Sequence, residues 1–141
     1  MSEEIKNNEK PELDWTNLGF GYHETPARFV AHFTDGKWDE GGLTADPNVV
    51  LSESACVLHY SQAVFEGLKA YHTEDGRIIC FRPELNAQRI NDSCERMAIP
   101  PLPDGMFMRA VDETVKANAD YVPPYGTGAS LYLRPIAFGT T

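Results

Sequence analysis

Hydrophobic and polar residues alternate along the first half of the chain in patterns that predict a hairpin, a strand and a helix. Residues 28–38 place two short apolar runs around an Asp-Gly pair, which predicts two strands joined by a tight turn. Residues 48–51 read Asn-Val-Val-Leu after a proline, and this β-branched run predicts a further short strand. Within residues 59–71, apolar side chains recur at spacings of four, four and three. That spacing predicts a helix, which Gly67 weakens.

The second half of the chain predicts two helices between two strands. Residues 77–81 read Arg-Ile-Ile-Cys-Phe after a turn, which predicts a strand that Arg82-Pro83 ends, and Pro83 suits the first turn of a helix. From Pro83 onward apolar residues repeat at helical spacing until the next Pro-Pro pair. A second helix is predicted to begin near Asp104, which favours the N-cap position, and to end before Pro123. Residues 130–138 then alternate in the way that predicts a strand.

This order of elements indicates the fold class. Hairpin, strand, helix, strand, two helices and strand show no regular βαβ alternation. We therefore expect an α+β domain over residues 15–141, with a mostly antiparallel sheet and flanking helices. Residues 1–14 carry five acidic residues and two lysines without an apolar period, which predicts a flexible acidic arm.

Composition and charge exclude several classes of function. The chain of 141 residues is 42% hydrophobic and 23% charged, as is typical of a globular protein. Its net charge of -9 disfavours binding to nucleic acid or to an anionic membrane surface. The first residues are polar and acidic, whereas a secretory signal would be basic and then apolar. We expect a cytoplasmic protein that binds neither nucleic acid nor membranes.

Cysteine usage predicts free thiols and no metal site. The three cysteines are an odd number at wide spacings, which is a poor basis for a disulfide framework. Cys56 and His59 have the spacing of a ligand pair, but no second pair follows them. Structural zinc usually needs four ligands, so we expect no bound metal.

Two arginines are the best candidates for binding chemistry. Arg89 lies on a predicted helix and Arg134 on the last predicted strand, each beside aromatic or apolar residues. A guanidinium can hold a phosphate or a carboxylate through two parallel hydrogen bonds. The alternative is a surface pair with a nearby acid such as Glu84 or Glu95, and pattern alone favours that alternative. Four further residues are interpreted from pattern alone as structural: Glu66, Tyr60, Phe65 and Tyr132.

Three motifs, taken together, resemble a known family. Residues 58–71 read LHYSQAVFEGLKAY, residues 81–89 read FRPELNAQR, and residues 128–135 read GASLYLRP. In this order and at these separations they resemble branched-chain aminotransferases, and the resemblance runs from about Trp15 to the last residue. It implies the smaller N-terminal domain of the type IV pyridoxal-phosphate fold, with an active site that faces a second, larger domain.

The resemblance also implies roles for individual residues. Arg89 resembles the arginine that binds the phosphate of pyridoxal 5'-phosphate, the cofactor. Three aromatic residues resemble the walls of the aliphatic side-chain pocket: Tyr60, Phe65 and Tyr132. Arg134 resembles the arginine that accepts the second carboxylate of glutamate. Tyr22 is a further candidate for the pocket, although the chain around it matches the family loosely.

Catalysis by such a family needs a lysine that this chain does not supply. Its lysines occur at positions 6, 10, 37, 69 and 116, and none occupies the motif of the Schiff-base lysine, which lies beyond residue 141. The chain alone is therefore expected to be inactive. The complete enzyme would transfer the amino group of leucine, isoleucine or valine to 2-oxoglutarate, giving glutamate and a branched 2-oxo acid, and would form a homodimer.

Two other interpretations of the sequence remain. The same fold serves D-amino acid aminotransferases and aminodeoxychorismate lyases, although the FEGLKAY and LYLRP segments favour the branched-chain group. Alternatively, the chain is a non-catalytic module for anion binding or dimerisation that uses Arg89 and Arg134 without chemistry.

Overall fold

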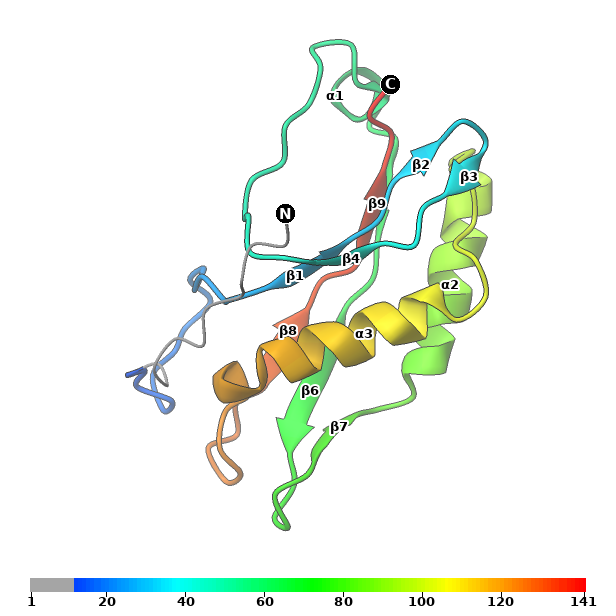
Figure 1. Cartoon of the computed structure of the whole chain (residues 1–141). Coiled ribbons are helices and arrows are strands. Elements are labelled where there is room, and N and C mark those ends of the chain that lie inside the picture. The colour runs from blue at the N-terminus through cyan, green and yellow to red at the C-terminus, as the bar shows by residue number, and fades with distance from the viewer. Residues whose placement is uncertain (1–11) are drawn as a thin grey trace.

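The computed structural model describes residues 12–141, so most of the predicted acidic arm lies outside the described residues. Its strands pair in antiparallel fashion throughout. Two long helices, α2 (Pro83–Arg96) and α3 (Met106–Ala117), pack against one face of the strands, and α3 crosses the sheet (Figure 1). The predicted α+β class with an antiparallel sheet and flanking helices is confirmed.

The central sheet is built from five short strands. Strand β5 (Ala63–Phe65) pairs with β9 (Ile136–Phe138). Strand β6 (Leu68–His72) pairs with β8 (Leu131–Leu133) on one side and with β7 (Ile78–Cys80) on the other. Because β5 leads into β6 and β8 leads into β9, the two sets of pairs follow one another along the same two stretches of chain.

These two stretches form one ladder with a break in the middle. Val64 faces Ala137 and Leu68 faces Leu133, so the register is the same on both sides of the break. At the break, Glu66 N–H donates to the Pro135 carbonyl at 2.9 Å. Pro135 has no N–H to return the bond, which explains why regular pairing stops there.

Residues 28–38 contain the predicted hairpin, but only residues 33–38 form it, and residues 28–30 pair with a later strand. Strands β2 (Phe33–Thr34) and β3 (Lys37–Trp38) form a short hairpin around Asp35 and Gly36. Outside it, β1 (Arg28–Val30) pairs with β4 (Gly42–Thr44), a strand that the sequence pattern did not predict. Asp35 and Gly36 both have positive φ, as a tight hairpin turn requires.

The core lies between the central sheet and the two helices. It gathers alternate residues of the strands and one stripe of each helix, together with the loops that follow them: Val64, Leu68, Ala70, Ile90, Cys94, Ile99, Phe107, Val111, Val115, Val122, Leu133 and Ala137. The helical stripe predicted for both helices is confirmed by their buried residues. Strands β1 and β4 lie beside α3, where the buried amide of Asn118 bonds both to Ala27 N–H and to the Ala27 carbonyl.

The helix predicted over residues 59–71 is wrong. Helix α1 (Cys56–Tyr60) ends at Tyr60, its C-cap residue Ser61 has a φ of 52°, and two strands follow. Val64 and Leu68 are four apart, a spacing that satisfies a period of two as well as a helical one. The burial of alternate residues from Val64 to Ala70 shows that the period is two.

Three smaller predictions also need correction. Residues 48–51 form no strand, and Val49 and Val50 are exposed because that stretch makes no ladder within the described chain. Residues 130–138 form β8 and β9 rather than one strand, since Pro135 interrupts them. The N-cap of α3 is Gly105 rather than Asp104, and a 3-10 turn (Ala119–Tyr121) follows that helix.

The cysteines are free thiols, as predicted. Burial raises the pKa of both Cys80 and Cys94, so these thiols stay protonated and are poor nucleophiles. Among the described helices, none is long and apolar enough to cross a membrane. Within residues 12–141, no group of His, Cys, Asp or Glu side chains is arranged to hold a metal ion.

Candidate functional site

Arg89 and Glu66 form a two-pronged ion pair at the edge between α2 and the central sheet. Arg89 Nε donates to Glu66 Oε1 at 2.8 Å, and Arg89 Nη2 donates to Glu66 Oε2 at 2.7 Å. The Arg89 side chain is 58% exposed, whereas the Glu66 side chain is 10% exposed. The sequence pattern named Glu84 or Glu95 as the pairing acid, and the structure replaces both with Glu66, 23 residues away along the chain.

Glu66 is held in place by its surroundings as well as by Arg89. The buried side chain of Asn86 donates to Glu66 Oε2 at 2.8 Å and to the Gly67 carbonyl at 3.2 Å. The hydrogen bond from Arg89, with further help from Asn86, lowers the pKa of Glu66 although burial opposes it. The same contact raises the pKa of Arg89. Both groups are therefore charged at neutral pH.

The pair leaves part of Arg89 available for a ligand. A guanidinium carries five N–H donors, and Glu66 uses the Nε edge and one N–H of Nη2. Nη1 and the second N–H of Nη2 lie on the opposite edge of an exposed side chain, and no partner for Nη1 occurs among the described residues. This edge has the fork geometry that binds two oxygens of a phosphate or carboxylate.

A second group of predicted residues meets on the other face of the ladder. Arg134 lies over the ring of Phe65, with its Cζ 4.4 Å from the ring centroid, and 5.3 Å from the centroid of Tyr132. Arg134 Nε also donates to the Tyr132 hydroxyl at 3.3 Å. All three residues are exposed, so a cation and two aromatic rings form an open surface.

Gly67 allows this group to form. A Cβ built at Gly67 would lie inside contact distance of the Tyr132 hydroxyl and 3.0 Å from its ring carbon Cζ. The absence of a side chain therefore lets the Tyr132 ring lie across the break in the ladder. The helical pattern predicts Gly67 as a weak point of a helix, whereas Gly67 lies in a strand break beside the Tyr132 ring.

Three consecutive residues connect the two groups. Phe65 supports Arg134 on the outer face, Glu66 holds Arg89 on the helix face, and Gly67 provides space for Tyr132. Successive residues of a strand point to opposite faces, which explains why neighbours in sequence serve different groups. A period of two over residues 64–70 places Glu66 on the face opposite to that of Phe65 and Gly67, but does not show which residues these contact.

The structure does not bring Tyr60 or Tyr22 into either group. Tyr60 is the last residue of α1, is 78% exposed, and has its ring 6.3 Å from that of His59. Tyr22 lies in an irregular segment before β1 and is 80% exposed. Among the described residues, no hydrogen bond or ring contact joins either tyrosine to Phe65, Tyr132 or Arg134.

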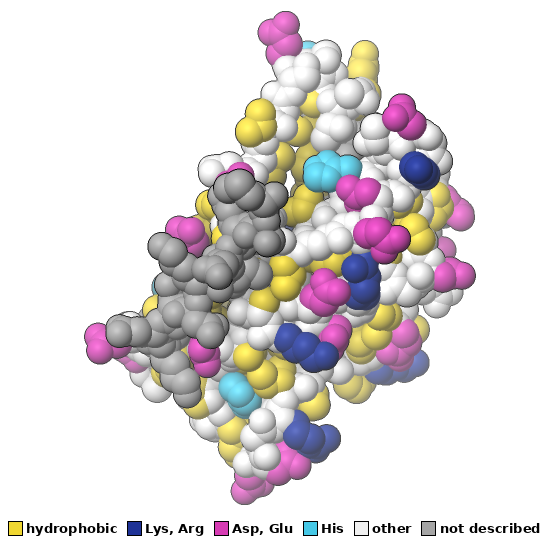
Figure 2. Space-filling model, viewed as in Figure 1, with side chains coloured by type: hydrophobic (Ala, Val, Ile, Leu, Met, Phe, Trp, Pro, Cys, Tyr) yellow, Lys and Arg dark blue, Asp and Glu magenta, His cyan; other side chains and the backbone are white. Residues whose placement is uncertain are grey.

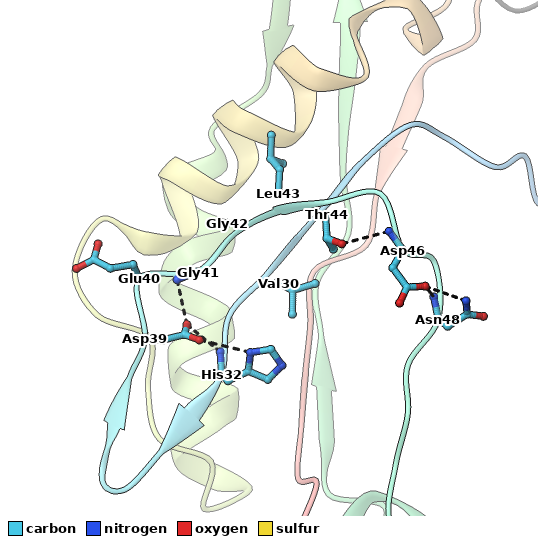
Figure 3. A pocket seen from close by; sticks show the side chains of 10 residues that line it. All are labelled: Val30, His32, Asp39, Glu40, Gly41, Gly42, Leu43, Thr44, Asp46 and Asn48. Carbon is cyan, nitrogen blue, oxygen red and sulfur yellow. Dashed lines mark hydrogen bonds and ion pairs between the residues drawn. The ribbon is translucent and has the colours of Figure 1, made fainter. Parts of the chain in front are cut away.

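A hollow elsewhere on the surface is a poor alternative site for an anion. It lies between β1, β4 and the segment after β4, and is lined by Val30, His32, Asp39, Glu40, Gly41, Gly42, Leu43, Thr44, Asp46 and Asn48 (Figure 3). Three carboxylates line it, Asp39, Glu40 and Asp46, and like charges repel an anion. None of the predicted site residues lines it.

Charge on the visible surface is mixed in sign. Figure 2 shows Lys and Arg side chains interspersed with Asp and Glu over the face that carries α3. With a net charge of -9, this mixed pattern does not favour a phosphate backbone. A single arginine with an available edge suits a small anion better than a polymer.

Comparison with known proteins gives consistent relatives. The chain is 52% identical over 128 residues to the branched-chain-amino-acid aminotransferase of Haemophilus influenzae, a match that covers 91% of this chain and 37% of that protein. It is 48% identical to the enzyme of the same name from Helicobacter pylori, covering 90% of this chain and 37% of the relative. It is 44% identical to branched-chain-amino-acid transaminase 1 of Bacillus subtilis, a match that covers 94% of this chain and 36% of the relative. No protein-family model matches the chain.

Proposed function

Because the chain belongs to the branched-chain-amino-acid aminotransferase family, with its match confined to the N-terminal part of those proteins, we propose that it is the small N-terminal domain of such an enzyme. The chain spans about 37% of the length of the Haemophilus influenzae and Helicobacter pylori relatives. The proposed activity, transfer of an amino group from leucine, isoleucine or valine to 2-oxoglutarate, therefore belongs to a complete protein. The domain would contribute binding groups, and a second domain would contribute the lysine.

The observation that carries the proposal is the available edge of Arg89. We assign this edge to the phosphate of pyridoxal 5'-phosphate, because an exposed guanidinium with N–H groups to spare can bind two phosphate oxygens. When bound, the cofactor acts as an electron sink for bond breaking at the α-carbon of the amino acid. Arg89 would fix one end of the cofactor and thereby orient it against the substrate.

The outer face of the ladder is assigned to the substrate. The rings of Phe65 and Tyr132 offer an apolar surface to a branched aliphatic side chain. Arg134, held between these rings, would accept the second carboxylate of glutamate or 2-oxoglutarate. Tyr60 and Tyr22 remain proposed contributors to this pocket. They would reach the pocket only if contacts with other parts of the complete protein brought them close to it.

Association and location complete the proposal. Exposed apolar side chains, among them Phe65 and Ile136 on the outer face, suit contact with a second domain and with the partner subunit of a homodimer. Three free cysteines suit a reducing compartment such as the cytoplasm.

A chimera tests the proposal directly. The present chain would replace the matching segment of the Haemophilus influenzae relative, with which it shares 52% identity. We expect transamination of L-leucine with 2-oxoglutarate and no activity with D-alanine or aminodeoxychorismate. Arg89→Ala in the chimera should raise the Kd for pyridoxal 5'-phosphate about tenfold or more, because charge-assisted hydrogen bonds are lost.

Controls separate loss of the site from loss of the fold. Arg82→Ala removes an exposed arginine from the start of the same helix, where it pairs with Glu84 at 3.6 Å, and should leave cofactor affinity unchanged. A folded chimera that prefers D-alanine would contradict the proposed substrate. Unchanged cofactor binding by Arg89→Ala would remove Arg89 from its assigned role.

A further inference from the structure

The Arg89–Glu66 pair is anchored on the side of the carboxylate. Glu66 is 9% exposed, and its Oε2 accepts hydrogen bonds from Asn86 Nδ2 at 2.8 Å and from Arg89 Nη2 at 2.7 Å. Asn86 is itself buried and is tied to the Gly67 carbonyl. Arg89, by contrast, is a long side chain on the exposed face of α2. The fixed partner is therefore the acid, and the group that needs fixing is the arginine.

We infer that Glu66 is a positioning residue, which holds Arg89 by its Nε edge and so turns the Nη1 edge outward to receive a phosphate. The inference rests on the proposed function, because the phosphate is the ligand proposed there. A free arginine samples many rotamers and loses that freedom when it binds. With two hydrogen bonds to a buried carboxylate, most of that entropy is already lost before the phosphate arrives.

A negative charge beside an anion site also has an opposite effect. The Glu66 carboxylate repels a phosphate, so its removal would favour phosphate binding through charge alone. Two substitutions separate charge from position. Glu66→Asp keeps the charge, but its side chain is one methylene shorter and cannot reach both Nε and Nη2. Glu66→Gln keeps the length and loses the charge.

Nuclear magnetic resonance of the 141-residue chain measures both effects. We would record the order parameter of Arg89 Nε without ligand, and then titrate with inorganic phosphate. In Glu66→Asp the order parameter should fall, and the Kd for phosphate should rise about two- to tenfold, the expected cost of ordering one rotamer-rich side chain. Glu84→Asp shortens an exposed acid of the same helix in the same way and should change neither quantity.

Each result decides the inference. An unchanged Arg89 order parameter and phosphate Kd in a folded Glu66→Asp chain would overturn it, with backbone amides of α2 and β6 reporting the fold. If Glu66→Asp does not fold, Glu66→Gln is judged by the Arg89 order parameter, which must fall because one of the two hydrogen bonds is lost. The proposed function fails separately, if Arg89→Ala binds phosphate as well as the parent chain does.

Discussion

The two faces of the broken ladder are made from alternate residues of the same strands, yet they have opposite properties. On the helix face, side chains such as Val64, Leu68 and Leu133 are each less than 10% exposed. On the outer face, Phe65, Tyr132 and Ile136 are 62%, 48% and 56% exposed. Folding of this chain therefore uses one face of the ladder, while the aromatic side chains of the other remain available for binding.

The contrast also separates the two proposed ligand contacts. Arg89 lies at the edge of the packed face and takes its orientation from a buried acid, whereas Arg134 lies on the open face between two exposed rings. The phosphate contact is thus tied to the stability of the core. The substrate contact is tied to side chains that can move without disturbing the fold.

Stability should show the largest difference between the faces. Leu68→Ala removes a buried side chain from the core and should lower the free energy of unfolding by about 2 to 5 kcal/mol. Phe65→Ala, three residues earlier on the outer face, should cost less than about 1 kcal/mol, because the ring is exposed and loses mainly its contact with Arg134. Urea unfolding of both variants measures the difference, and equal losses would contradict the two-face description.

Gly67→Ala should disturb the outer face while leaving the packed face intact. The new Cβ would collide with the Tyr132 hydroxyl, so the ring must move away from the ladder, at a cost of about 1 to 3 kcal/mol. Tyr132 and Arg134 resonances should shift, whereas those of the core should not. Gly42→Ala is the matched control, since a Cβ at Gly42 meets nothing within 4 Å. Similar shifts in both variants would contradict this account of Gly67.

The sequence predicts the long helices of this fold but not the short strands around Glu66. Helices α2 and α3 were predictable because each has a long apolar stripe and proline residues near its ends. The region around Glu66 was not, because Val64 and Leu68 fit two periods equally and the strands there have three and five residues. The hydrophobic pattern alone therefore does not decide between a helix and a strand for this region.

The residues of the candidate site were predictable where their own chemistry indicates binding, and not where their role depends on tertiary packing. Arg89 and Arg134 were identified as candidate binding residues from their chemistry, and the structure brings Arg134, Phe65 and Tyr132 together. The roles of Glu66 and Asn86 are not predicted, because Glu66 lies at the strand break and bonds to Asn86 and Arg89 of a helix 20 or more residues away. Such a contact depends on how the helix packs on the sheet, which local periodicity does not report.

Arg134→Met offers a functional test of the open face within the chimera. Met keeps an apolar side chain over Phe65 but removes the charge that would bind the second carboxylate. The KM for 2-oxoglutarate should rise about tenfold, equal to about 1.4 kcal/mol, while the KM for leucine changes little. Steady-state kinetics with both substrates measures the ratio. Equal increases for the two substrates would show that Arg134 supports the pocket generally and does not select the acidic substrate.

The smallest expected effect is a dependence of stability on pH that belongs to the packed face. The hydrogen bond from Arg89 lowers the pKa of Glu66 below its ordinary value of 4.5, so the unfolded chain takes up the proton at a higher pH than the folded chain. The stabilisation that the ionised Glu66 side chain gives to the folded chain is therefore fully present above pH 4.5, and it is lost as the pH falls through the lower pKa of the folded chain. Urea unfolding should show that the free energy of unfolding of the parent chain exceeds that of Glu66→Gln by a constant amount near neutral pH. This difference should narrow below about pH 4.5. Phe65→Ala, on the open face, should show no such narrowing, and a difference for Glu66→Gln that persists unchanged at low pH would mean that the Glu66 charge contributes nothing to folding.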